Sequence, residues 1–185
     1  FTETDGKKRN NGGFALQILQ RRLASSPAAI YQSLKRRRER LENELAEARL
    51  AAKGRKASFN DESKMVSEEV LDNFDEFGQG EVDELEELIA TGATSAETIE
   101  QLAIEVEALK DLEVMALNVL KSGEDTKWKQ LNQILDDDLM VDSEGIRRKL
   151  IVFTEPKDTL HYLADKVRAR LGKPEAVEVI HGGVA

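Results

Sequence analysis

Residues 27–53, PAAIYQSLKRRRERLENELAEARLAAK, contain the pattern that decides the fold of this chain. The apolar residues that share one helix face in this stretch are Ile30, Leu34, Leu41, Leu45 and Ala48. They recur at steps of three, four and seven residues, which is the spacing of an amphipathic α-helix. Ser26 suits the N-cap, Pro27 suits the first helical position, and Gly54 supplies a stop. The stretch therefore predicts one long helix.

A second helical pattern of similar length ends near Lys121, where Ser122-Gly123 follows. Thr94-Ser95-Ala96-Glu97 precedes it with the hydroxyl and carboxylate spacing of a capping box. Its apolar stripe consists of Ile99, Leu102, Val106, Leu109, Leu112, Ala116 and Val119. Because each helix must bury its stripe, we expect the two to pack antiparallel as a hairpin.

Shorter helices are expected around this hairpin. Residues 1–13 are polar and rich in Gly and Asn, which predicts a flexible lead-in. A short helix from residue 14 to 23 should follow, with candidate buried positions at Phe14, Leu16, Ile18, Leu19 and Leu23. Helices over 65–77 and 82–92 should lie at the tip or side of the hairpin.

A further helix is predicted to start at an N-cap provided by Asp125 or Thr126. It should end at Asp136-Asp137-Asp138. Three clustered carboxylates can hold a divalent metal, but no further ligands follow at a fixed loop spacing. A solvated helix end is therefore the preferred interpretation.

The character of the sequence changes at Arg147. Residues 149–154, KLIVFT, are apolar and rich in β-formers, as in a buried parallel strand. Residues 156–171 predict an amphipathic helix, and residues 177–180, VEVI, a second strand. The predicted fold class is mainly α: an antiparallel helical hairpin or bundle, followed by a truncated α/β (βαβ) unit.

Charge is distributed unevenly along the 185 residues, whose net charge is −9. Residues 1–56 carry +8, residues 57–145 carry −20 and residues 146–185 carry +3. A basic N-terminal segment attracts polyanions, whereas the acidic middle should face away from nucleic acid or towards a basic partner. The absence of cysteine excludes disulfides and suits a reducing cytoplasm. No run approaches the length of a membrane span, so no membrane partner is expected.

Catalytic motifs are missing from the sequence. It contains no Gly-rich phosphate loop with Lys-Ser/Thr, no Gly-x-Ser-x-Gly elbow and no His-Glu-x-x-His pair. The chain by itself therefore holds no complete active site.

Two groups of residues are candidates for contacting DNA. The first is basic and consists of Arg21, Arg22, Lys35, Arg36, Arg37 and Arg38. Arginine suits phosphate because its planar fork donates two hydrogen bonds. A solvated basic face, or pairing with Glu39, Glu42 and Glu44, explains the same residues equally well. The second group follows the predicted strands, where ligands of α/β sheets bind, and consists of Thr154, Glu155, Gly182 and Gly183.

Three segments resemble one family in the expected order. KLIVFTE at 149–155, DTLHYL at 158–163 and VIHGG at 179–183 resemble the start of the second RecA-like lobe of superfamily 2 helicases. DTKWKQLNQIL at 125–135 resembles the helix before that lobe in the Swi/Snf-related translocases. LQRRLASSP at 19–27 resembles the helix and turn after their first lobe.

The resemblance implies an internal fragment of an ATP-dependent DNA helicase or translocase. Residues 14–145 would be the helical region between the motor lobes, with an acidic insertion at 57–123, and residues 146–185 would begin lobe two. ATP and Mg²⁺ would bind the parent, while the fragment lacks the nucleotide-binding motifs and holds no cofactor. Expected partners are duplex DNA, contacted through its backbone, and the remaining lobes. The alternative is a non-enzymatic helical module that binds a protein partner through its hairpin.

Overall fold

The computed structural model describes residues 3–53, 79–94 and 96–181, and this part of the chain is mainly helical, as predicted. The helices are α1 (Glu3–Ser25), α2 (Pro27–Lys53), α4 (Gln79–Gly92), α5 (Ile99–Ser122), α6 (Thr126–Asp136) and α7 (Lys157–Leu171), with short 3₁₀ turns η3 (Asp138–Met140) and η4 (Pro174–Ala176). The predicted helix over 65–77 lies outside the described residues. None of the described helices is both long and apolar enough to cross a bilayer.

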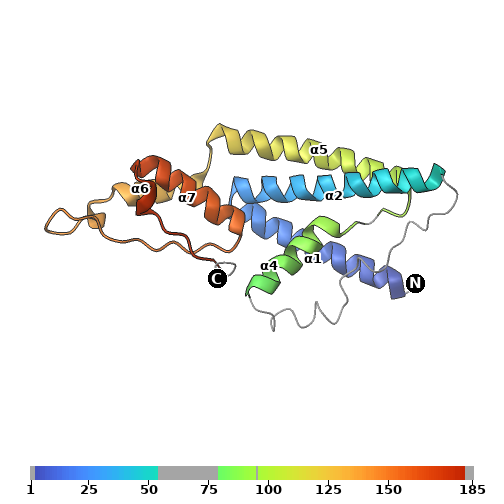
Figure 1. Cartoon of the computed structure of the whole chain (residues 1–185), viewed down its shortest axis with the longest axis horizontal. Coiled ribbons are helices and arrows are strands. Elements are labelled where there is room, and N and C mark those ends of the chain that lie inside the picture. Colours follow the sequence, from blue (N-terminus) through green and yellow to red (C-terminus); the bar gives the residue numbers. More distant parts are fainter. Residues whose placement is uncertain (1–2, 54–78, 95, 182–185) are drawn as a thin grey trace.

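The predicted hairpin is present. Helices α2 and α5 run antiparallel along each other (Figure 1), and Arg38 pairs with Glu113 while Glu42 pairs with Lys110. Their shared core consists of Leu34, Leu41, Leu45, Ala96, Leu102, Val106, Leu109 and Ala116. The apolar periodicity of both segments therefore places most of this core correctly.

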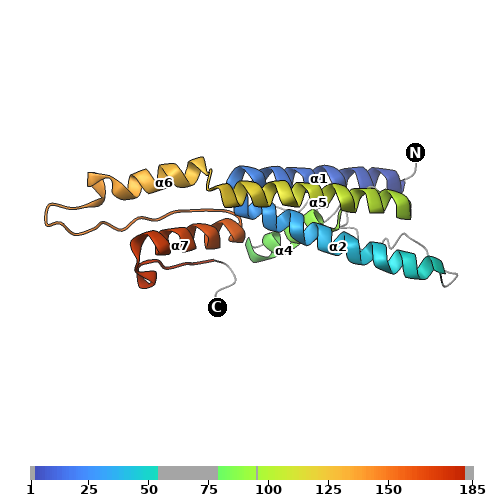
Figure 2. The ribbon, with the colours of Figure 1, turned by 90° about the horizontal axis from the view of Figure 1, so that it is seen from above.

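Helices α1 and α4 pack on another side of α2 (Figures 1 and 2). Ala15 and Ile18 of α1 meet Ile89 and Ala90 of α4 in a second small core. Helix α1 begins at Glu3, so most of residues 1–13, which the composition assigns to a loop, are helical. Extending a helix is far less costly than starting one, and the packed turns after Phe14 supply the start.

Two leucines of α1 that were expected inside are outside. Leu16 is 57% exposed and Leu23 is 64% exposed, whereas Ala15 and Ile18 are buried. The buried face follows the steps from 15 to 18 to 22, so Arg22 occupies the next inward position. A long, charged side chain is therefore buried on the same face as Ala15 and Ile18.

Helix α5 starts one turn later than its predicted capping box. Thr98, not Thr94, is the N-cap and accepts a hydrogen bond from the backbone N–H of Gln101. The Gln101 side chain accepts in turn from the N–H of Glu97 at 2.7 Å. A related cap is therefore present four residues further on, with the returning bond made to the residue before the cap. Thr94 instead donates to Glu105 at 2.6 Å.

Helices α6 and α7 are joined by one carboxylate and one cation. Asp125 caps α6 by accepting from the N–H of Trp128 at 3.0 Å, and its second oxygen accepts from Tyr162 of α7 at 2.9 Å. Lys166 lies 5.2 Å from the Trp128 ring and 5.1 Å from the Tyr162 ring. Helix α6 ends at Asp136 as predicted, and among the described residues no cluster of three potential metal ligands is found.

The structure does not show the predicted strand–helix–strand unit. Helix α7 is present, but the flanking segments 149–154 and 177–180 form no ladder in the described part of the chain. Their apolar side chains point to solvent: Ile151 is 76% exposed, Phe153 is 91% exposed and Ile180 is 87% exposed. A strand needs neighbours to pair with, and these described segments have none.

Candidate functional site

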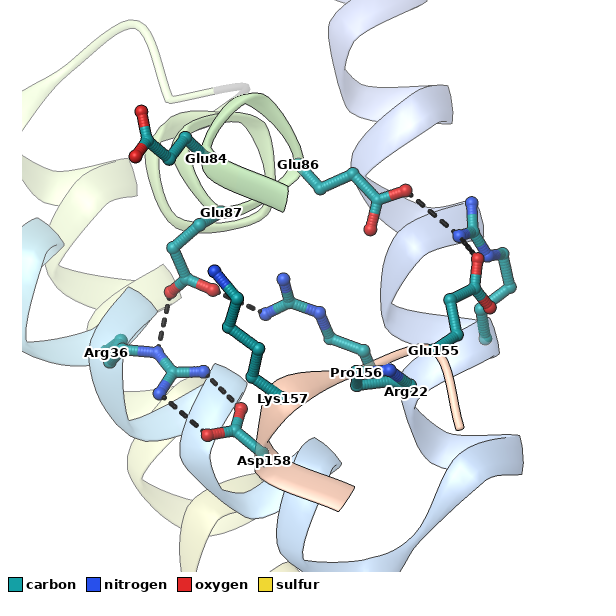
Figure 3. Close-up of a pocket in the computed structure, with 10 residues that line it drawn as sticks. Arg22, Arg36, Glu84, Glu86, Glu87, Glu155, Pro156, Lys157 and Asp158 are labelled. Atoms are coloured by element: carbon teal, nitrogen blue, oxygen red, sulfur yellow. Dashed lines mark hydrogen bonds and ion pairs between the residues drawn. The ribbon is translucent and has the colours of Figure 1, made fainter. Parts of the chain in front are cut away.

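Charged side chains from four helices meet around one cavity, which we call the junction (Figure 3). It lies where α1, α2 and α4 meet the start of α7 and has a volume of about 340 Å³. Its lining residues are Arg21, Arg22, Arg36, Glu84, Glu86, Glu87, Glu155, Pro156, Lys157 and Asp158.

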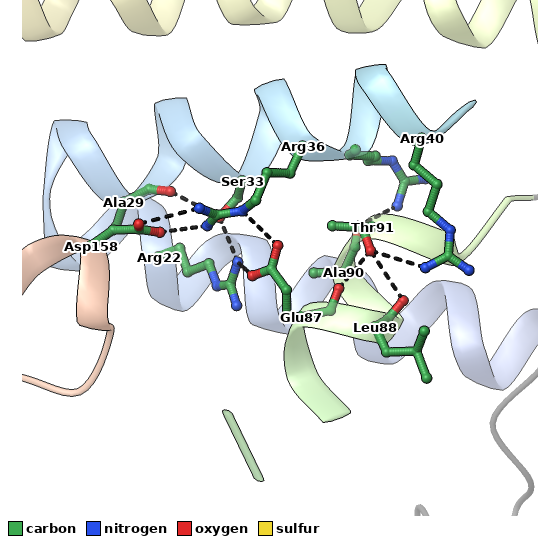
Figure 4. Close-up of polar contacts among 11 residues, drawn as sticks. Arg22, Ala29, Ser33, Arg36, Arg40, Glu87, Leu88, Ala90, Thr91 and Asp158 are labelled. Atoms are coloured by element: carbon green, nitrogen blue, oxygen red, sulfur yellow. Dashed lines mark hydrogen bonds and ion pairs between the residues drawn. The ribbon is translucent and has the colours of Figure 1, made fainter. Parts of the chain in front are cut away.

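Glu87 of α4 is the centre of the junction. Arg22 of α1 donates to one carboxylate oxygen of Glu87 at 2.7 Å, and Nε of Arg36 of α2 lies 2.6 Å from the other carboxylate oxygen of Glu87 (Figure 4). The second contact is an ion pair without hydrogen-bond geometry, since neither of its two atoms has a hydrogen-bond partner. Arg22 also donates to Ser33 at 2.7 Å, and Ser33 donates to the carbonyl of Ala29. The carboxylate of Glu87 thus links α4 to both α1 and α2.

Arg36 extends this network to α7. Its guanidinium donates to both oxygens of Asp158, at 3.3 Å and 2.5 Å, in the bidentate geometry that makes such pairs strong. Burial by itself lowers the pKa of Arg36, but the hydrogen bond to Asp158 and the charge of Glu87 outweigh it, so the pKa is raised. Arg36 therefore stays charged while its two acidic partners face it from α4 and α7.

Arg21 contributes the outer side of the junction. It forms ion pairs with Glu155 and, at 3.0 Å, with Glu86 of α4. Burial raises the pKa of Glu86, the nearby charge of Glu155 adds to the rise, and Arg21 and Arg22 oppose it. The surroundings of Glu86 therefore disfavour its charged form.

Three hydroxyl groups form hydrogen bonds beside these ion pairs, where the turn between α1 and α2 meets α7. Thr159 of α7 lies within 2.8 Å of both Ser25 and Ser26. Ser26 also caps α2 by accepting from the N–H of Ala29 at 3.1 Å. The turn between α1 and α2 is therefore fixed directly to the first turn of α7, more than a hundred residues later in the chain.

The arginines proposed as DNA contacts are paired within the chain. Besides Arg21, Arg22 and Arg36, Arg37 binds Glu105 at 2.7 Å and two carbonyls at the end of α4. Arg38 binds Glu113 at 2.5 Å. The alternative of local pairing holds in part, because Arg38 also contacts Glu39 at 3.5 Å and Glu42 at 2.6 Å, and Arg40 contacts Glu44 at 3.6 Å.

The other candidate residues are not gathered into one place. Lys35 and Thr154 are partly exposed, and neither lines the junction. Glu155 belongs to the junction as a partner of Arg21. Gly182 and Gly183 lie outside the described residues.

Of the acidic residues that line the junction, the sequence singled out Glu155 as a candidate but not Glu86, Glu87 or Asp158. Glu86 and Glu87 belong to no motif, and only the charge imbalance pointed to them, whereas Asp158 lies in the DTLHYL segment but was not a candidate contact. The segment carrying +8 is neutralised by the segment carrying −20, through pairs such as Arg22–Glu87 and Arg37–Glu105.

Comparison with known proteins gives no relative: no family model, no curated protein and no solved structure matches the chain.

Proposed function

We propose that this chain is the helical region between the two motor lobes of a Swi/Snf-related DNA translocase, together with the start of the second lobe. The observation that carries the proposal is the junction. Residues that resemble the exit from lobe one, Arg21 and Ser26, contact residues that resemble the entry to lobe two, Glu155 and Thr159.

The contact between these two segments would hold the lobes of such a motor next to each other. A chain that leaves one lobe, forms a helical excursion and returns beside its point of departure keeps the two lobes adjacent. These motors bind ATP and Mg²⁺ between their lobes, so the distance between the lobes matters for the reaction. The junction of this chain sets the distance between the lobes through its ion pairs and hydroxyl contacts.

The extended segments on both sides of α7 fit the same proposal. Residues 149–154 and 177–180 flank a helix, as in the crossover of a parallel sheet. Their exposed apolar side chains, such as Ile151 and Ile180, would be buried once further strands pair with them. We therefore retain them as the first strands of a RecA-like lobe that is completed by the rest of the parent.

The paired arginines favour the lobes over DNA as partners of the helical region. A phosphate would have to displace Glu87 from Arg22 or Glu113 from Arg38, both held at 2.7 Å or less. DNA would then be held mainly by the lobes, in a parent that acts in the cytoplasm. Among the proposed contacts, Lys35 and Thr154 remain the ones that neither line the junction nor enter a recorded ion pair of the described chain.

The test uses the complete polypeptide that contains this chain. We expect it to carry an ATP-binding lobe upstream of Phe1 and to hydrolyse ATP in response to duplex DNA. Asp158→Arg should lower the DNA-stimulated rate roughly twofold to thirtyfold, the range that such contacts transmit. Arg36→Asp combined with Asp158→Arg should restore part of the loss.

The matched control is Asp165→Arg on the exposed side of α7, where Asp165 contacts only Arg168 among the recorded ion pairs. It should leave the rate unchanged. A polypeptide without an ATP-binding lobe, or without DNA-stimulated hydrolysis, would refute the proposal. Equal loss from Asp165→Arg and Asp158→Arg would remove the role given to the junction.

A second candidate function is a protein-interaction module. One observation favours it: α5 exposes apolar side chains along a face that no other described helix covers, including Ile104 at 70% and Met115 at 63%.

A further inference from the structure

Helix α5 carries a second apolar row besides the one that packs on α2. Its members are Ile104, Ala108, Leu112, Met115 and Val119. They follow at steps of four, four, three and four residues, so they lie along one side of the helix over about 22 Å. The large members are well exposed: Ile104 70%, Met115 63%, Val119 51% and Leu112 46%.

The row differs from ordinary exposed apolar residues. A single exposed leucine or valine is normal on a protein surface, whereas a contiguous row marks a binding surface. The buried residues Leu102, Val106 and Leu109 already satisfy the packing of α5 on α2. The second row is therefore not needed for the hairpin and is available to another helix.

The border of the row is acidic. Glu100, Glu107 and Asp111 are exposed and lie along one side of it, at steps of seven and four residues. Glu107 is paired with Lys110 at 2.9 Å. Within the part of the chain that the structure describes, no ion pair is recorded for Glu100 or Asp111.

This charge selects the occupant. Two copies of α5 packed antiparallel along their rows would bring acidic border against acidic border, which is unfavourable. A helix whose apolar stripe is flanked by lysine and arginine would instead place a cation beside Glu100 and Asp111.

We propose that the exposed row of α5 is a docking site for an amphipathic helix of a partner protein, with a leucine-type stripe flanked by basic residues. The apolar row supplies the contact area, and the acidic border sets the orientation and rejects acidic helices. The site is separate from the junction and does not depend on the motor function proposed above.

The experiment measures binding of two fluorescein-labelled synthetic helices to the intact chain by anisotropy. Both peptides have leucine at the a and d heptad positions and differ only in having lysine or glutamate at the e and g positions. We expect the lysine peptide to bind and the glutamate peptide to bind at least roughly tenfold more weakly.

Three variants connect the binding to the row. Ile104→Ser with Met115→Ser should weaken binding of the lysine peptide roughly tenfold. Glu100→Lys with Asp111→Lys should reverse the preference between the two peptides. Leu50→Ser, at a residue of α2 that is 70% exposed, is the matched control and should change nothing. Circular dichroism confirms that each variant keeps its helix content.

Two results would overturn the proposal. Binding of the lysine peptide that is unchanged in both double variants would place it elsewhere on the chain. Sedimentation that shows a dimer of the chain, abolished by the Ile104 and Met115 substitutions, would assign the row to a second copy instead.

Discussion

At the scale of single residues, Glu86 and Glu87 show how burial and pairing compete in the junction. They are neighbours on α4, and both carry a carboxylate oxygen without a hydrogen-bond partner. Glu87 is shared by Arg22 and Arg36, and its side chain is 33% exposed. Glu86 is 10% exposed at its side chain and has Arg21 as its nearest cation. Burial therefore dominates at Glu86 and raises its pKa.

This contrast predicts opposite effects of two conservative substitutions. Because the folded protein holds a proton on Glu86 more readily than the unfolded chain does, the stability contributed by this group is present at low pH and is lost as pH rises through its folded pKa. Glu86→Gln should therefore leave the free energy of unfolding at pH 7 unchanged or raised, and this advantage should shrink below pH 4 to 5, near the ordinary pKa of glutamate.

Glu87→Gln provides the comparison, because it leaves Arg22 buried with one charge partner fewer. We expect it to lower the free energy of unfolding at pH 7 by about 1–2 kcal/mol. Urea unfolding at both pH values measures the two variants. A loss at Glu86→Gln as large as that at Glu87→Gln would contradict the assignment.

At the scale of elements, Asp125 decides how the α6–α7 pair is attached. One oxygen caps α6 and the other receives the Tyr162 hydroxyl, so a single residue both starts one helix and docks the next. Burial raises the pKa of Tyr162, and the hydrogen bond to Asp125 raises it further. The phenol thus remains the donor throughout the neutral range.

The double role can be separated by substitution. Tyr162→Phe removes the contact between the helices and keeps the cap, and it should cost about 1 kcal/mol of unfolding free energy. Asp125→Ala removes both and should cost about 1 kcal/mol more, the usual worth of an N-cap. Thermal unfolding followed by circular dichroism measures both variants. Equal losses from the two would mean that the cap contributes nothing.

At the scale of the whole molecule, the basic and acidic parts of the chain pair with each other, and a net charge of −9 remains. Arg22, Arg36 and Arg38 of α1 and α2 pair with acidic residues of α4, α7 and α5, so these arginines do not form an open basic surface. A basic stretch of sequence therefore does not by itself amount to a free basic surface in the described part of the fold.

We accordingly expect weak, salt-sensitive and sequence-independent binding of duplex DNA by this chain. Replacing Arg36, Arg37 and Arg38 by alanine should reduce its helix content and lower its unfolding temperature as well, since Arg37 and Arg38 hold α5 against α2. Lys35→Ala, which touches no recorded ion pair of the described chain, should keep the fold. Fluorescence anisotropy with labelled duplex, alongside thermal unfolding, checks both.

Tight binding that persists at moderate salt, and that is lost in the triple variant while the fold is kept, would show that these arginines contact DNA and that the pairs open in its presence.

The local elements were accessible from sequence because their signals are local. The steps of three and four between Leu34, Leu41 and Leu45 place them on one face whatever surrounds the helix. Caps at Ser26 and Asp125 depend on the next three residues only, and both are present. The cap of α5 was misplaced because Thr94 and Thr98 both have the right chemistry nearby.

The tertiary structure alone decided what each face meets. Leu16 and Leu112 share the periodicity of buried residues, yet both are exposed, because the angle at which a helix sits on its neighbour selects one face among several. Arg22 is buried for the same reason, next to an acid 65 residues away. The sequence by itself determined that α2, α4, α5, α6 and α7 exist, that α2 and α5 form a hairpin, and that the charge is unevenly distributed, but not that α1 begins at Glu3. The pairing of those charges into a junction required the fold, since it depends on contacts between residues far apart in the chain.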